Sequence, residues 1–264
     1  MFLDTEDVNL YYEVKGEGEP LLLVHGVVVD AGLYDEASKL LAKQYKVITY
    51  DRRGSSRSKV HGENVPYDVD TQIQDMCTLL DALGLEKVRI CGVSAGAVLG
   101  CHFLQHYPER VEKLLMYEPP IVTLLPERKD YQDWVLKMKD LISRRKYNGA
   151  FFEFVQSING TDERAGEKPK DLAEREMNNI YHALDDEYSV FIDYKPNMAL
   201  VKKYVDKIIV AIGERSDGGP YPEAAKRFAE LSGAPLLHFP GYHNLPYELP
   251  LDFAVCVAGA FLMC

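Results

Sequence analysis

Short apolar runs recur along this sequence, and most are separated by segments whose apolar residues follow a helical period. Residues 8–14 alternate apolar and polar side chains, which is typical of a strand with one buried face. The later runs are continuously apolar, as in strands covered on both faces, and occupy residues 21–24, 46–51, 87–93, 112–118, 206–213 and 234–239. Residues 68–83 carry apolar side chains at helical spacing and predict a helix. Strands that alternate with helices predict an α/β fold with a mostly parallel central sheet flanked by helices.

This alternation breaks down between residues 121 and 200, where no run resembles a strand of the main sheet. Trp134, Met138 and Leu141 recur there at helical spacing, and a stretch of about 80 residues is too long for a bare loop. We therefore expect a helical cap, or lid, at 121–200, inserted into a core of residues 1–120 and 201–264. The apolar run at 253–264 is too short to cross a bilayer and predicts a buried terminal helix.

The charge balance narrows the range of partners. The 264 residues carry a formal net charge of −11, and no basic face is visible, which argues against nucleic acid and anionic membranes. The acidic N-terminus lacks the pattern of a signal peptide, and the five cysteines include no Cys-x-x-Cys pair. We therefore expect a cytoplasmic protein with reduced thiols that binds a small-molecule substrate and neither nucleic acid nor membrane. A homodimer is compatible with this expectation.

Residues 90–98, ICGVSAGAV, place Ser94 between two glycines, after a predicted buried strand and before a small-residue helix. A strand followed by Gly-x-Ser-x-Gly and a helix is the nucleophile elbow, a strained turn that exposes the serine hydroxyl above the sheet. Because a serine hydroxyl is unreactive at neutral pH, it requires a base within hydrogen-bond reach. Among the seven histidines, His243 is the best candidate because it lies in a loop after the last predicted strand.

Four motifs in chain order extend this pattern: His25-Gly26, Asp51-Arg52-Arg53-Gly54, Gly92-Val93-Ser94-Ala95-Gly96 and Pro240-Gly241-Tyr242-His243. With these motifs the sequence resembles the α/β-hydrolase fold superfamily, and within it a serine hydrolase or esterase-like subgroup with a helical cap. The resemblance covers nearly the whole chain apart from the middle of the cap. It implies that the backbone N–H groups of Val27 and Ala95 form an oxyanion hole, and acyl transfer does need such preorganised donors.

The acid that would orient His243 is left open. In the family it lies in the loop after the penultimate strand, which here reads GERSDGGP at 213–220. Asp217 is the first choice, although it stands one position later than the common family pattern, and Glu214 lies in the same loop. Some family members instead carry the acid after the strand that follows the elbow helix, where this chain has Glu118.

Together these residues predict a serine hydrolase, foremost a carboxylic ester hydrolase, that acts through a Ser-His-acid triad and an acyl-enzyme without metal or organic cofactor. Val28 beside the oxyanion hole and Trp134 of the cap are candidate pocket residues, and His25 either touches substrate or holds its loop. Dehalogenases and epoxide hydrolases of this fold need Asp at the elbow, which Ser94 excludes. Thioesterases, perhydrolases and carbon–carbon bond hydrolases remain open, and so does a non-catalytic small-molecule receptor on the same fold.

Overall fold

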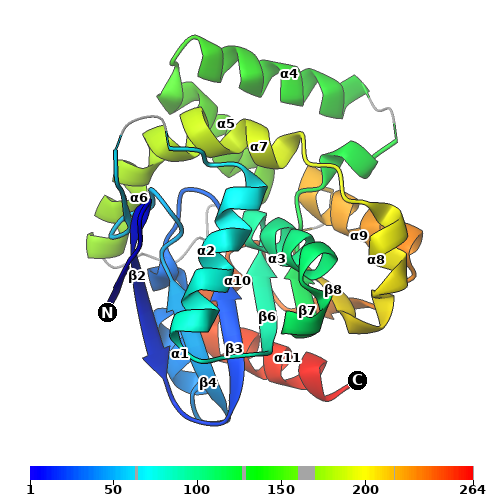
Figure 1. Ribbon diagram of the computed structural model, residues 1–264. Helices are drawn as coiled ribbons and strands as arrows, with labels where there is room; N and C mark the ends of the chain where they lie inside the picture. Colours follow the sequence, from blue (N-terminus) through cyan, green and yellow to red (C-terminus); the bar gives the residue numbers. More distant parts are fainter. Residues whose placement is uncertain (63–64, 127–128, 160–169, 217, 264) are drawn as a thin grey trace.

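The strands form one twisted sheet at the centre of the molecule (Figure 1). The computed structural model describes residues 1–62, 65–126, 129–159, 170–216 and 218–263. Within them, nine strands make the sheet, in the order β1-β2-β4-β3-β6-β7-β8-β9, with β5 paired to β2. The strands are β1 (Phe2–Asp4), β2 (Val8–Lys15), β3 (Glu19–Val24), β4 (Tyr45–Tyr50), β5 (Lys59–Val60), β6 (Val88–Val93), β7 (Val111–Tyr117), β8 (Ile208–Gly213) and β9 (Leu236–Phe239). The neighbours from β4 to β9 pair in parallel, whereas β2 pairs antiparallel with β1, β4 and β5, which confirms the predicted fold class.

Helices cover both faces of the sheet. They are α1 (Asp35–Leu41), α2 (Val69–Ala82), α3 (Ala95–His106), α8 (Met198–Lys203), α9 (Pro220–Ser232), α10 (Leu245–Glu248) and α11 (Pro250–Leu262). Helix α2 lies within the predicted helix at 68–83, and its first turn is capped by Asp68, whose side chain accepts the Thr71 N–H at 2.8 Å. Gly84 follows the end of α2 with a φ of 64°, a left-handed conformation that costs glycine little and suits a helix end.

Successive residues of the central strands face opposite sides of the sheet. Leu22 and Val24 of β3 pack in the core shared with α2 and α3, whereas Leu21 and Leu23 pack in the core shared with α1 and α11. Figure 1 shows α2 and α3 in front of the central strands. Because both faces are covered, both sets of side chains must be apolar. The continuous apolar runs of the sequence follow from this arrangement.

Helices also lie over the carboxyl ends of the parallel strands, at the top of Figure 1. They are α4 (Lys129–Ser143), α5 (Tyr147–Asn159), α6 (Lys170–His182), the π-helix η4 (Ala183–Glu187) and α7 (Tyr188–Ile192). No strand occurs in the described part of residues 121–200. Helix α8 crosses the predicted boundary at residue 200, and the division of the chain into core and cap remains a prediction.

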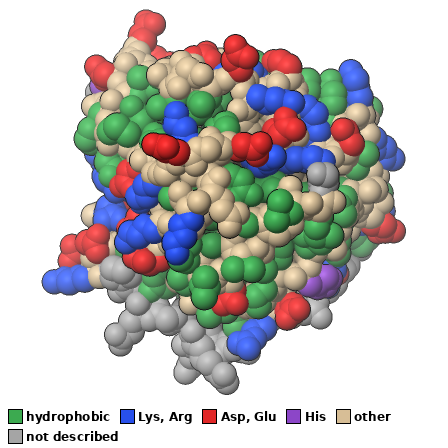
Figure 2. All heavy atoms as spheres, turned by 90° about the horizontal axis from the view of Figure 1, so that it is seen from below, with side chains coloured by type: hydrophobic (Ala, Val, Ile, Leu, Met, Phe, Trp, Pro, Cys, Tyr) green, Lys and Arg blue, Asp and Glu red, His purple; other side chains and the backbone are tan. Residues whose placement is uncertain are grey.

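The surface carries charges of both signs. On the face in Figure 2, acidic and basic side chains are interspersed with hydrophobic ones, so the net charge of −11 is not concentrated there. Among the helices that the structure describes, none combines the length and apolar character of a membrane span. Cys77, Cys91, Cys101 and Cys256 are free thiols, of which the first three are buried.

Gly96 lies where α3 begins against β3. A Cβ atom at this position would lie 2.0 Å from the carbonyl oxygen of Val24. We therefore expect Gly96→Ala to lower the free energy of unfolding by about 3 kcal/mol, because strand and helix must move apart. Urea denaturation measures this change. Gly259→Ala in α11 is the matched control, since its Cβ would meet nothing within 4 Å, and it should stabilise by up to about 1 kcal/mol. Equal effects of the two substitutions would contradict the close approach.

Candidate active site

Ser94 occupies the tight turn between β6 and α3. Its backbone has φ 55° and ψ −123°, in the positive-φ range that non-glycine residues rarely adopt. Gly92 and Gly96 make this turn sterically accessible, because a Cβ on Gly92 would lie 2.3 Å from the carbonyl oxygen of Gly96. The helix therefore starts directly after the strand, in the geometry that the Gly-x-Ser-x-Gly pattern predicts. The strain of the turn holds the Ser94 side chain at the carboxyl edge of the sheet.

The imidazole of His243 contacts the carboxylate of Glu118. His243 Nδ1 lies 2.6 Å from Glu118 Oε2, and both side chains are buried. The second carboxylate oxygen, Oε1, accepts the backbone N–H of Gly213 at 2.8 Å. Glu118 itself has a φ of 46°, and its own N–H donates to the Ala211 carbonyl. Both carboxylate oxygens are thus held by neighbours, so the carboxylate has one defined orientation toward the ring.

This contact determines which ring nitrogen of a neutral His243 carries the proton. A carboxylate only accepts hydrogen bonds, so Nδ1 donates to it and Nε2 keeps its lone pair. The loop that carries the histidine is tied to β7, because the Tyr117 hydroxyl donates to the Tyr242 carbonyl at 2.6 Å. The arrangement presents a basic nitrogen from a fixed ring.

Ser94 and His243 line the same cavity, which has a volume of about 280 Å³. Most of its wall is apolar. The lining residues are Gly26, Val27, Val28, Val29, Leu33, Val93, Ser94, Phe151, Phe154, Val155, Ile158, Glu176, His243 and Asn244. Four of these side chains come from α5 and one from α6, so those helices form one wall of the cavity above the sheet edge (Figure 1).

The loop after β3 passes beside Ser94. Val28 has a φ of 71° there, a strained conformation for a β-branched residue. The N–H groups of Val27 and Ala95 make no hydrogen bond within the described part of the chain. Val27 lines the main cavity, and both residues line a smaller cavity that also touches Ser94. Two amide hydrogens are therefore available beside the serine.

His25 is fully buried and is not among the residues that line the cavity. Its Nδ1 contacts the Gly26 carbonyl at 2.7 Å and its Nε2 accepts the Arg52 N–H at 2.9 Å. Burial lowers the pKa of His25 to about 3, with the nearby Arg52 acting in the same direction. A neutral ring therefore joins the loop after β3 to the loop after β4. These contacts favour the interpretation that His25 holds its loop.

Two further contacts tie the loop after β3 to the helices above it. The Asn179 amide of α6 donates to the Val28 carbonyl at 2.8 Å, and its oxygen accepts the Ser56 N–H at 2.8 Å. The guanidinium of Arg52 donates to the Gly26 carbonyl and to both carboxylate oxygens of Glu187 in the π-helix. The strained loop is thus held from the sheet side and from the helix side.

The other sequence candidates lie elsewhere. Asp217 is outside the described residues, and Glu214 has an exposed side chain. Trp134, expected in the pocket, instead has its ring edge-on against Tyr188 and Tyr221 at 6.5 and 6.1 Å.

The sequence interpretation missed two polar residues of the cavity wall, Glu176 and Asn244. Asn244 directly follows His243, so its position was a usable signal. Glu176 lies on the buried face of α6 together with Leu172 and Ile180, at helical spacing, but this spacing alone does not indicate that the glutamate lines a cavity.

Comparisons with known proteins agree with this architecture. Residues 19–206 match the family model of the α/β hydrolase fold. The uncharacterized hydrolase YraK of Bacillus subtilis is 29% identical over 249 residues, which cover 92% of this chain and 88% of YraK. An Azorhizobium caulinodans protein named "Putative carbamate hydrolase RutD" is 36% identical over 109 residues, covering 41% of this chain and 40% of that protein.

A solved structure from Pseudomonas aeruginosa, titled a "putative epoxide hydrolase", superposes with a TM-score of 0.77 at 19% identity. The match covers all of this chain and 95% of that chain. At this sequence identity it supports the same fold and nothing about activity. The family model spans well over half of the sequence, and the sheet order and the turn at Ser94 agree with it. This chain therefore belongs to the α/β-hydrolase fold family and is a hydrolase of that fold.

Proposed function

We propose that this protein is a serine hydrolase of ester or related acyl substrates, with Ser94 as nucleophile, His243 as general base and Glu118 as the acid that orients the base. The observation that carries the proposal is the 2.6 Å contact between His243 Nδ1 and Glu118 Oε2, beside a serine in the same cavity. Glu118 is preferred to Glu214, which is exposed, and to Asp217, which lies outside the described residues.

The proposed reaction follows the serine-hydrolase scheme. His243 Nε2 takes the proton of Ser94 Oγ as that oxygen attacks the carbonyl carbon, and the protonated ring then gives the proton to the leaving alcohol. Water, deprotonated by the same nitrogen, then attacks the acyl-enzyme, and the ring returns this proton to Ser94 Oγ as the acid leaves. The N–H groups of Val27 and Ala95 would bind the oxyanion, and each such donor is worth about 2.7–4 kcal/mol of transition-state stabilisation.

The cavity wall supports a small, uncharged substrate. Its apolar side chains favour an apolar acyl or alcohol group, and Glu176 disfavours an anionic one. The helices of residues 121–200 would act as a cap that controls access, because α5 and α6 contribute Phe151, Phe154 and Glu176 to the wall.

The substrate classes in the names of the similar proteins differ in whether a serine nucleophile could act on them by acyl transfer. A carbamate, the substrate class in the name of the Azorhizobium relative, has a carbonyl carbon that a serine can attack. An epoxide has no carbonyl carbon, and epoxide hydrolases of this fold need a carboxylate at the elbow, where this chain has Ser94. We therefore do not extend epoxide hydrolysis to this protein.

A fluorophosphonate probe tests the proposal directly. We expect one covalent adduct on Ser94 by intact-mass and peptide analysis, because an activated serine attacks the phosphorus as it would an acyl carbon. The same protein should hydrolyse neutral p-nitrophenyl esters, with a chain-length optimum set by the cavity. Ser94→Ala should show no adduct. Failure of the parent protein to label would contradict the proposal and favour a non-catalytic receptor.

A further inference from the structure

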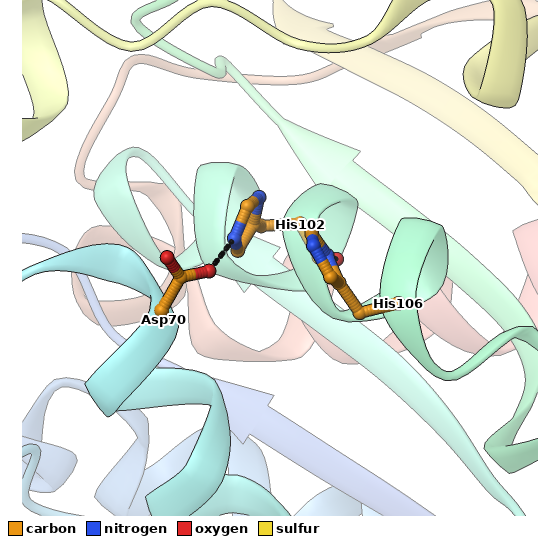
Figure 3. A group of neighbouring side chains, drawn as sticks. All are labelled: Asp70, His102 and His106. Carbon is orange, nitrogen blue, oxygen red and sulfur yellow. Dashed lines mark hydrogen bonds and ion pairs between the residues drawn. The ribbon is translucent and has the colours of Figure 1, made fainter.

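Three metal-ligating side chains meet on the surface between α2 and α3, away from the cavity of Ser94. Figure 3 shows Asp70 from the first turn of α2 facing His102 of α3, with His106 one helical turn further along. One ligand atom of each residue lies within 4.8 Å of those of the other two. None of the three belongs to the wall of the active-site cavity, so the proposed hydrolase mechanism does not use them.

The hydrogen bonds of the two rings indicate which ring nitrogens can become ligand atoms. His106 Nδ1 contacts the His102 carbonyl oxygen at 2.9 Å, and since a carbonyl only accepts, Nδ1 carries the proton and Nε2 keeps a lone pair. His102 Nε2 lies 2.7 Å from Asp70 Oδ1 and, since a carboxylate only accepts, it donates to Asp70 when no ion is bound. Its Nδ1 lies 3.4 Å from the Tyr194 hydroxyl, which can accept the Nδ1 proton once an ion takes the place of the proton on Nε2. Metal-bound histidines in proteins are usually oriented in this way, with the second ring nitrogen bonded to a carbonyl or another polar group.

The site also combines one fixed ligand with two adjustable ones. The His102 side chain is 14% exposed and lies edge-on against the Tyr194 ring. The Asp70 side chain is 76% exposed and His106 is exposed, so both can rotate by the small amount needed to approach an ion. Metal–ligand bonds of about 2.0–2.2 Å require ligand atoms some 3–3.5 Å apart. The ligand atoms of the three residues already lie within 4.8 Å of one another.

We propose that Asp70, His102 and His106 bind one divalent transition-metal ion of the zinc class, with water in the remaining coordination positions. Two imidazoles and one carboxylate suit zinc and its neighbours, whereas magnesium and calcium prefer oxygen ligands throughout. The ion would replace the hydrogen bond between His102 and Asp70. It would join α2 to α3, the helix that begins directly after Ser94, so binding stabilises the folded chain.

Zinc titration of the chelator-treated full chain, followed by calorimetry and by the thermal unfolding midpoint, tests the site. We expect saturable binding of one zinc ion per chain and a rise of the midpoint. His106→Gln and Asp70→Asn should each weaken zinc binding at least about tenfold, because each removes one of the three ligands. Both side chains are exposed, so both variants should fold, and the midpoint without zinc checks that.

His61→Gln is the matched control. His61 forms an exposed pair with Asp4 at 2.9 Å, without a third ligand in the described part of the chain, and its loss should leave zinc affinity unchanged. Magnesium chloride at the same concentration should not move the midpoint. The proposal is overturned by equal zinc affinity in parent and His106→Gln, by an equal loss in His61→Gln, by an equal response to magnesium, or by no saturable binding.

Discussion

Ser94→Ala is expected to lower kcat/KM for a hydrolysed ester by a factor on the order of 10⁴ to 10⁶. The alanine removes the oxygen that we propose as the nucleophile, whereas the cavity wall and the N–H groups of Val27 and Ala95 remain. Their residual binding sets the lower limit of the rate. Steady-state hydrolysis of p-nitrophenyl esters, with active-site titration of the parent protein, measures the loss.

Two controls make this result specific. Ser143→Ala changes an exposed serine whose hydroxyl donates to the Asp140 carbonyl in α4, and it should leave the rate unchanged. His243→Ala should cost about as much as Ser94→Ala, and the double variant should cost little more, because residues that act as a unit are not additive. A Ser94→Ala protein that keeps the parent rate would refute a serine nucleophile.

Glu118→Gln is expected to lower kcat by about 10⁴ with little change in the folded structure. The Gly213 N–H donates to Oε1, so in the variant it would hold the amide oxygen and turn the NH₂ group toward His243. That group donates to Nδ1 and favours the proton on Nε2, which removes the lone pair needed to activate Ser94. Rates of ester hydrolysis, together with circular dichroism spectra of parent and variant, separate this effect from unfolding.

Asp217→Asn and Glu214→Gln are the matched variants, because the sequence leaves all three carboxylates open as the acid. We expect both to keep the hydrolysis rate within a few-fold of the parent, since Glu118 already occupies His243 Nδ1. A larger loss in Asp217→Asn than in Glu118→Gln would assign the acid to the loop after β8 instead. Equal losses in all three would argue against a single orienting carboxylate.

Features encoded within a few neighbouring residues were predictable. Alternation of apolar and polar residues marked β2, and continuous apolar runs marked β3, β4, β6, β7, β8 and β9, because a strand covered on both faces must be apolar on both. β1 and β5 were not predicted, since strands of three and two residues show no measurable period. The turn at Ser94 was predictable from the sequence because Gly92 and Gly96 stand where a Cβ atom would clash with nearby backbone.

The partner of His243 was not predictable in the same way. Glu118 follows β7 and Glu214 follows β8, and the carboxyl ends of neighbouring parallel strands meet at one edge of the sheet. The positions of Glu118 and Glu214 along the chain therefore do not show which of them contacts His243. What distinguishes Glu118 is its positive φ and the Gly213 N–H that holds its second oxygen.

Local patterns of apolar, small and polar residues were thus enough to predict the fold class and the turn at Ser94, which the structure confirms, and to single out His243 as the candidate base. The contact of Glu118 with His243 and the meeting of Asp70 with His102 and His106 came from packing. Glu118 and His243 lie 125 positions apart along the chain, and Asp70 and His102 lie 32 apart. Side chains so distant in sequence approach one another only after strands and helices have taken their places, which no short stretch of sequence specifies.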